Sequence, residues 1–338
     1  MRLSAAHLVD TAVRLADLRF PATTVHVHRT RLAYIHLEHL LHFAKIDRDG
    51  RIDGFIAAYL PNEVALLFLE QGEVVTAAAM AESGREVLPI ATALGRIEDE
   101  LERGELAFCE APLQQLGWMY SSCAGPLTQR PVIQREPWLL FEALKHERYS
   151  GILELISDGR VTYLHFSDGR YQSGQFCDKD EAVTVSDFVK GLLASGPEGS
   201  VPNIVAAVFD AQDVLPKQAP PPMIATYHTL FWRIADAAEG QVAGEGMRRA
   251  VTVRDTVRNI HPSVRAIGGD RDSEPEAVVV TPEALTLGLS DWVGQLLEQL
   301  EVIAPGVAPE ILREATREHR FVLQKAGFYD RLPWSVTW

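Results

Sequence analysis

An internal repeat constrains this chain more than any other feature of its sequence. Residues 54–72 read GFIAAYLPNEVALLFLEQG, and residues 151–169 read GILELISDGRVTYLHFSDG. A glycine begins and ends each segment, so the two segments align without a gap at an offset of 97 residues. Each segment divides into two apolar runs separated by a short polar turn, which is the pattern of a β-hairpin. The chain is therefore expected to contain the same antiparallel hairpin twice.

The later turn of each repeat carries residues that adopt positive φ with little strain. Gln71-Gly72 follows the first hairpin and Asp168-Gly169 follows the second, and such pairs favour tight turns. A third strand is expected after each turn, so each repeat predicts a β-meander. Five positions are interpreted as structural turns and not as functional groups: Gly54, Gly72, Gly151, Asp168 and Gly169.

Helical patterns flank both meanders. The helices that precede the meanders are expected over Leu37–Ile46 and Trp138–Leu144, where apolar residues recur on one face. The helices that follow are expected over Val87–Leu101 and Val183–Leu193, and each leads to a final short strand. Each repeat therefore predicts an α+β module.

The sequence changes character after the second module. Residues 214–223 (VLPKQAPPPM) are rich in proline, and a proline run favours an extended linker over a helix or a central strand. Thr281, Pro282 and Glu283 have the order of an N-cap, a first helical residue and an acid in the first turn. Helical patterns over 227–238, 247–260 and 310–326 complete the prediction of a small helical bundle.

The predicted fold class is α+β, with two tandem helix–β-meander–helix modules followed by a mainly α-helical bundle domain. The first module is expected over residues 1–125, with an N-terminal helix, and the second over 126–213. The linker then takes 214–223 and the helical domain 224–338. A chain of 338 residues has the length of two or three ordinary domains.

Composition limits the classes of function. The 46 Asp and Glu residues exceed the 32 Lys and Arg residues, giving a formal net charge of −14, which argues against a general binder of nucleic acid or anionic membrane. Three cysteines without CxxC spacing fit neither a disulfide framework nor a zinc ribbon. The first residues carry charges where a signal peptide is apolar, and no stretch reaches the roughly 18 apolar residues of a membrane span. A cytoplasmic location is therefore expected.

Histidines offer the most direct candidates for chemistry. His36, His39 and His42 recur at every third position, but His36 and His42 would lie about 240° apart around a helix, and a metal site needs convergent ligands. Cys177 and His165 would form a thiol–imidazole pair only if the strands bring them together. The nucleophile-elbow, zinc-protease and phosphate-loop motifs are absent from the sequence. No catalytic residue, metal ligand or cofactor is assigned.

Two features are candidates for a partner surface. One expected helix carries a stripe of arginines, and the last eleven residues contain Phe, Tyr and two Trp. Without interleaved aromatic residues the stripe does not predict stacking on single-stranded nucleic acid. The alternatives are a solvated helix face and a tail that packs on the bundle. The residues assigned to this surface are Arg248, Arg249, Arg254, Arg258, Trp334 and Trp338.

The second meander carries a recognisable pattern in Tyr149–Leu155, in Val161–Phe166, and in the run from Ser167 through Asp168-Gly169 to the small residue Gly174. With these residues it resembles the PATAN family, the amino-terminal domain of cyanobacterial PatA-type regulators. The first meander resembles the family more faintly. It matches at the glycines of its two ends and departs at Pro61-Asn62 and at Gln71. The resemblance covers about residues 30–215 and does not reach the helical region.

The resemblance implies a non-catalytic signalling or scaffolding module, with no catalytic residues to carry over. The expected function is therefore that of a bacterial signalling or scaffolding protein that binds another protein, such as a signalling or motility component. The alternative is a small-ligand or metal-dependent sensor or enzyme with a site between the two modules, using His36, His39 or His165. Binding of nucleic acid through the arginine stripe is a third, less favoured hypothesis.

Overall fold

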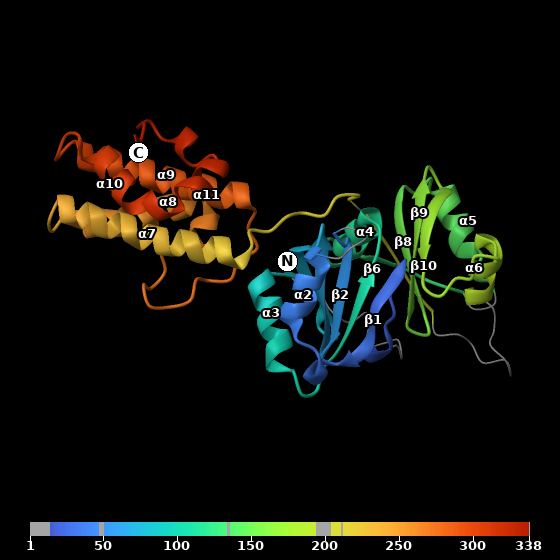
Figure 1. Ribbon diagram of the computed structural model, residues 1–338. Coiled ribbons are helices and arrows are strands. Elements are labelled where there is room, and N and C mark those ends of the chain that lie inside the picture. The colour runs from blue at the N-terminus through green and yellow to red at the C-terminus, as the bar shows by residue number, and fades with distance from the viewer. Residues whose placement is uncertain (1–13, 47–50, 134–135, 194–203, 211, 338) are drawn as a thin grey trace. The chain divides into compact units, whose positions relative to one another are not determined.

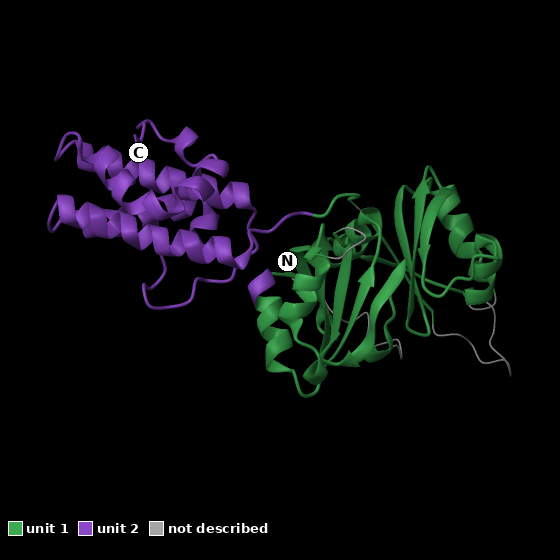
Figure 2. Cartoon of the chain, in the orientation of Figure 1, with its two compact units in different colours: residues 1–88, 92–215 green, residues 89–91, 216–338 purple. Residues whose placement is uncertain are grey.

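The computed structural model describes residues 14–46, 51–133, 136–193, 204–210 and 212–337 (Figure 1). The fold is mixed α/β, with a six-stranded and a five-stranded antiparallel sheet. The chain divides into two compact units (Figure 2), of which the first comprises residues 1–88 and 92–215 and the second residues 89–91 and 216–338. Both sheets belong to the first unit.

The six-stranded sheet contains the first repeat, in the strand order β1-β6-β2-β3-β4-β5. Strands β2 and β3 are buried along almost their whole length, so this sheet is covered on both faces. The strands are β1 Thr24–Arg31, β2 Gly54–Tyr59, β3 Glu63–Glu70, β4 Glu73–Ala81, β5 Gly84–Leu88 and β6 Glu105–Glu110.

The five-stranded sheet contains the second repeat, in the order β10-β9-β8-β11-β7. Strand β10 forms one edge of this sheet, and the short strand β7 forms the other. The strands are β7 Thr128–Arg130, β8 Gly151–Ser157, β9 Arg160–Ser167, β10 Arg170–Phe176 and β11 Ile204–Phe209.

The two meanders pair their strands in the same register. Gly54 lies opposite Leu69 in the first meander, and Gly151 lies opposite Phe166 in the second, each shifted by 97 residues. The ladder between the second and third strands is interrupted at the same place in both, next to Leu69 and next to Phe166. Both expected hairpins are therefore present, and their ladders also share this irregularity.

The tight turns explain the glycines that close each repeat. Gln71 and Gly72 have φ of 51° and 76°, and Asp168 and Gly169 have φ of 49° and 71°, which are left-handed values that suit a two-residue hairpin. A Cβ atom on Gly169 would lie 2.8 Å from the backbone of Lys145. Gly54 and Gly151, which were grouped with the turns, are instead the first residues of β2 and β8.

One core joins the two sheets of the first unit. It takes Phe55 and Phe68 from the first sheet, Ile152 and Tyr163 from the second, and Trp118 from helix α4. Helix α4 covers Leu113–Ala124 and is buried over most of its length. The sheets therefore share an apolar interior in addition to the contacts within each sheet.

Helices cover the remaining faces (Figure 1). Helices α2 (Leu37–Ile46) and α3 (Ile90–Asp99) accompany the first sheet, and helices α5 (Leu139–His146) and α6 (Val185–Leu193) accompany the second. A smaller core under α5 includes Leu144 together with Leu153, Leu155, Leu164 and Phe166 of the second sheet.

The N-terminal segment contacts both sheets before β1 begins. The Arg19 amide donates to the Gly159 carbonyl at 2.8 Å, and the Val161 amide donates to the Arg19 carbonyl at 2.9 Å. Four residues later the Thr23 amide donates to the Glu110 carbonyl of the first sheet at 2.8 Å. Arg19 therefore adds backbone hydrogen bonds to the β8–β9 hairpin, which lies far along the chain.

The second unit is built on five α-helices, whose bounds are α7 Pro221–Gln241, α8 Gly246–Ile260, α9 Pro282–Glu301, α10 Val307–Thr316 and α11 Arg320–Lys325. The Thr281 side chain accepts a hydrogen bond from the Ala284 amide at 3.2 Å, so it caps α9 as the sequence predicts. Phe231 of α7 and Trp292 of α9 stack in the core, with ring centroids 4.2 Å apart. Short 3-10 helices lie at Leu15–Asp17, Leu32–Tyr34, Pro262–Ala266, Arg317–His319 and Tyr329–Arg331.

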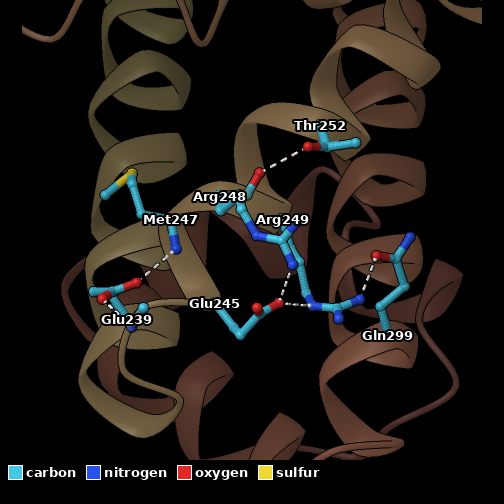
Figure 3. A network of polar contacts seen from close by, with 8 residues as sticks. Glu239, Glu245, Met247, Arg248, Arg249, Thr252 and Gln299 are labelled. Carbon is cyan, nitrogen blue, oxygen red and sulfur yellow. Dashed lines mark hydrogen bonds and ion pairs between the residues drawn. The ribbon is translucent and has the colours of Figure 1, made fainter.

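At two helix–helix connections of the second unit, a glutamate carboxylate accepts hydrogen bonds from two backbone amides. Glu239, near the end of α7, accepts hydrogen bonds from the amides of Gly244 and Met247 at 2.5 and 2.9 Å (Figure 3). Glu301, at the end of α9, accepts from the amides of Gly306 and Ala308 at 2.7 and 2.8 Å. These bonds stabilise the carboxylates and lower the pKa of both. Each carboxylate thereby satisfies free amides at the start of the next helix.

Several expected boundaries are wrong. The helix predicted over Val87–Leu101 divides into strand β5 and helix α3, and Pro89 lies between them. Helix α7 begins at Pro221, inside the predicted linker, because proline is tolerated in a first turn whose amides have no helical partner. The last predicted helix, 310–326, begins earlier, at Val307, and is divided into α10 and α11.

Candidate functional site

An apolar groove lies beside helices α5 and α6 on the second sheet. Its volume is about 760 Å³. The side chains that line it come from α5 and the residues just before it, from α6, and from strands β9 and β10. The lining is largely apolar and aromatic, and it includes Trp138, Phe141, Leu164, Phe166, Tyr171 and Val189.

The amphipathic pattern of α5 places aromatic side chains in this groove. Leu140 and Leu144 are buried against the sheet, while Trp138 and Phe141 line the groove. Phe141 and Phe166 approach each other with ring centroids 6.3 Å apart, and Phe166 makes a T-shaped contact with Tyr171 at the same separation. The groove floor is therefore a continuous set of aromatic contacts.

Two of these aromatic side chains stay open to solvent. Trp138 is 55% exposed and Tyr171 is 42% exposed. A single exposed apolar residue is ordinary, but several that gather around one groove are typical of an interaction surface. The groove is thus the strongest candidate for a binding site in the first unit.

The charged side chains that line the groove are both positive. Among the described residues that line it, the charged ones are Lys145 of α5 and Lys190 of α6. The Lys190 ammonium lies 3.6 Å from the Asp187 carboxylate, and both side chains are well exposed, so water screens this pair. Two lysines therefore flank an apolar groove in a chain whose formal net charge is −14.

A second cavity, of about 840 Å³, lies between the two sheets. The Arg29 guanidinium stacks over the Tyr59 ring, 4.0 Å from its centroid, and the Tyr59 hydroxyl donates to the Leu18 carbonyl at 2.8 Å. Burial raises the pKa of Tyr59 to about 12. Arg29 and Arg19 also pair with Glu105 and Asp178, respectively. The cations of this cavity are thus already engaged by the protein.

Two free thiols line the cavity between the sheets, and neither is activated. Burial raises the pKa of Cys109 to about 11 and that of Cys177 to about 12. A nucleophilic cysteine needs the opposite shift. The charged groups that influence the pKa of the Cys177 thiol are Asp178, Arg19 and Arg160. The His165 ring instead packs against the Trp118 ring, with ring centroids 5.8 Å apart.

A buried ion pair links the two sheets. The Arg85 guanidinium of β5 donates two hydrogen bonds to the Glu154 carboxylate of β8, at 3.0 and 2.6 Å. The side chains are only 10% and 2% exposed. The neighbouring carboxylate holds the pKa of Arg85 above its usual value despite desolvation. Both charges are paired within the protein, so we interpret this ion pair as a structural contact between the two sheets.

The histidine cluster does not converge. His36, His39 and His42 are exposed on and beside helix α2, and the rings of His36 and His39 have centroids 5.2 Å apart. Within the ranges that the structure describes, no group of three or more His, Cys, Asp or Glu residues is arranged to hold a metal ion. The cavity between the sheets is lined by His28 and by none of these three.

Three of the four stripe arginines are engaged within the second unit. Figure 3 shows two of them, Arg248 and Arg249. Arg248 and Arg249 share the Glu245 carboxylate at 2.5 and 2.9 Å. Arg254 donates to the Gly268 carbonyl at 2.6 Å and pairs with the neighbouring Asp255. Arg258 is exposed. The stripe therefore presents less free positive charge than its sequence indicates.

The aromatic tail is divided between core and surface. Phe328 is fully buried, and Trp334 packs, partly buried, against the core of the second unit. Trp338 lies outside the described residues. The packing of Trp334 agrees with the alternative in which the tail covers the bundle.

Sequence reasoning missed the residues that make the groove. Trp138 was identified only as the start of a helix, and Lys145 and Lys190 were not singled out. Each lysine lies in the last turn of a helix, where a cation has an ordinary role beside the helix dipole. Only the packing of both helices on one sheet shows that these two side chains flank the same surface.

Comparisons with known proteins add no assignment. No protein-family model matches the chain, no curated protein is similar to it, and no solved structure matches its fold. Among the helices that the structure describes, none is long and apolar enough to cross a membrane.

Proposed function

We propose that this chain is a non-catalytic bacterial signalling or scaffolding protein of the cytoplasm, made of two tandem PATAN-like modules and a helical bundle domain, that acts by binding another protein. The observation that supports this proposal is the apolar, partly exposed aromatic groove beside α5 and α6. Exposed aromatic side chains gathered in one concave surface are typical of sites that bind proteins.

Two further observations favour binding over catalysis. The thiols that line the cavity between the sheets have raised pKa values, so they are protonated at neutral pH and poor nucleophiles. The arginines of that cavity are occupied by Glu105, Asp178 and the Tyr59 ring. A substrate would have to displace these internal partners first.

A crosslinking experiment tests the proposal. The tagged full-length protein is crosslinked in lysate of its native cell, beside Trp138→Ala and the matched control Phe321→Ala. Phe321 is 70% exposed in the second unit, so the control removes an aromatic side chain away from the groove. The expected result is one protein recovered at a fixed ratio with the wild type and the control, and reduced by about tenfold with Trp138→Ala. Recovery of no protein at a fixed ratio would contradict the proposal.

The cavity between the sheets supports a second candidate function, a small-ligand sensor. Its volume of about 840 Å³ lies within the range of ligand sites. Native mass spectrometry of the purified chain separates the two candidates. A stoichiometric small molecule that is lost in Arg29→Ala favours the sensor, whereas a bare chain favours the binding protein.

A further inference from the structure

We infer that the groove beside α5 and α6 binds an acidic amphipathic helix of the partner protein. The inference rests on the proposed function, and it specifies which kind of segment the groove receives. Three features support it: the length of the helices beside the groove, its openness to solvent, and the sign of the charges that flank it.

The dimensions suit a short stretch of helix. Helices α5 and α6 contain 8 and 9 residues, so each is about 12–14 Å long at a rise of 1.5 Å per residue. A docked helix of about eight or nine residues covers the same length and presents apolar side chains at positions i, i+3, i+4 and i+7. The aromatic contacts from Phe141 through Phe166 to Tyr171 provide a continuous floor for such a stripe.

The openness of the groove favours a helix over an acyl chain. An acyl chain is apolar on all sides, so it needs an enclosed cavity to leave water. Trp138 and Tyr171 are large, half-exposed side chains of this groove, which therefore covers only one side of its occupant. An amphipathic helix needs to bury only one stripe and keeps its polar face in water.

The two lysines that line the groove favour an acidic occupant, although the Lys190 ammonium also lies 3.6 Å from the exposed Asp187 carboxylate. Lys145 and Lys190 belong to different helices, and among the described lining residues they are the charged ones. Carboxylates beside the apolar stripe of a docked helix would meet an ammonium group on either helix. Such exposed pairs contribute more to selectivity and to the rate of encounter than to affinity, and salt weakens them.

A charge-reversal experiment tests this inference on the full-length protein. The probes are two fluorescently labelled peptides of about 14 residues, long enough for a marginally stable helix. Both carry Leu at i, i+3, i+4 and i+7, and the flanking positions are Glu in one peptide and Lys in the other. Binding is followed by fluorescence anisotropy, and peptide helicity by difference circular dichroism. The protein variants are the double variant Lys145→Glu/Lys190→Glu, Trp138→Ala, and the control Phe321→Ala.

The Glu peptide is expected to bind the wild type at least about tenfold more tightly than the Lys peptide. The double variant, whose two altered side chains are exposed, is expected to reverse this preference, and the bound peptide is expected to gain helicity. Trp138→Ala weakens binding by about tenfold, and Phe321→Ala leaves it unchanged. Hydrogen exchange of the variants is the check that their folds are intact.

Several outcomes would overturn the inference. Equal binding of both peptides to the wild type would do so, as would an unchanged preference in the double variant. Binding without a gain in helicity would indicate strand addition at the edge strand β10 instead. Saturable palmitate binding, or dimerisation that Trp138→Ala abolishes, would assign the groove to a lipid or to a second copy. If the crosslinked partner depends on Trp138 while neither peptide binds, the proposed function stands and the acidic helix is wrong.

Discussion

Loss of the buried Arg85–Glu154 pair is expected to loosen the junction of the two sheets. In Glu154→Gln the guanidinium stays in place, enclosed by the protein, without its counter-charge. The structure shows two charge-assisted hydrogen bonds between side chains that are at most 10% exposed. Such bonds contribute about 1.5–3 kcal/mol each, and breaking one partner of a buried pair typically costs about 3–5 kcal/mol. A loss of that size is a large fraction of the stability of a typical domain, which is about 5–15 kcal/mol.

Hydrogen exchange measured by mass spectrometry is the suitable assay, because the chain has two compact units and a single unfolding midpoint would mix them. Peptides from strands β5 and β8 are expected to exchange faster in Glu154→Gln, by a factor that corresponds to about 3–5 kcal/mol. Peptides from α7 and α9 belong to the second unit and provide an internal control.

The double variant Arg85→Met/Glu154→Leu separates charge from packing. Replacing a buried pair by apolar side chains of similar volume is often neutral or stabilising, so this variant is expected to recover most of the protection lost in Glu154→Gln. If Glu154→Gln exchanges like the wild type, or if the double variant is as labile as the single one, the unpaired charge is not the cause and the reasoning is refuted.

Several further outcomes are expected. Gly169→Ala places a Cβ atom 2.8 Å from the Lys145 backbone at φ of +71° and is expected to cost about 1–3 kcal/mol. The helical Gly95 has open space, so Gly95→Ala is expected to stabilise the first unit by about 0.5–1 kcal/mol. Hydrogen exchange of peptides from the first unit compares the two variants. Thr281→Ala removes the cap of α9 and is expected to cost about 1 kcal/mol, seen as faster exchange in the first turn of α9 only. Burial raises the pKa of all three thiols above the value of about 8.5 for a free thiol, so a disulfide reagent at pH 8 is expected to label them slowly unless urea is added. Because the unfolded chain loses these protons first, the free energy of unfolding is highest below pH of about 8.5 and falls as the pH rises through the folded values. Rapid labelling of the native protein would contradict this burial. The thiols are those of Cys109 and Cys123, with pKa about 11, and Cys177, with pKa about 12.

Local signals predicted the hairpins, and long-range packing determined the rest. The pairs Gln71-Gly72 and Asp168-Gly169 carry their turn chemistry in two residues, so a sequence shows them directly. Thr281 and Pro282 mark the start of α9 in the same way. Each of these predictions depends on neighbours along the chain.

The missed elements lack such local markers. Strand β5 is five residues long, which is too short for periodicity to separate a strand from a helix. Helix α4 is buried around most of its circumference, so it has no clear polar face to reveal a helical period. The groove depends on Lys145 and Lys190, which are 45 residues apart in sequence and come together only through the second sheet.

The pairing of Arg85 with Glu154 also means that Arg85 is synthesised some time before its partner. The two residues are 69 positions apart, so a ribosome that adds about 5–20 residues per second leaves Arg85 without its carboxylate for roughly 3–14 s. During that interval the inner face of the first sheet has no second sheet to cover it, and residue 19 has no hairpin to pair with. The nascent chain thus presents apolar surface for a period that the rate of translation determines, and slowing translation between these two codons would lengthen its exposure to aggregation.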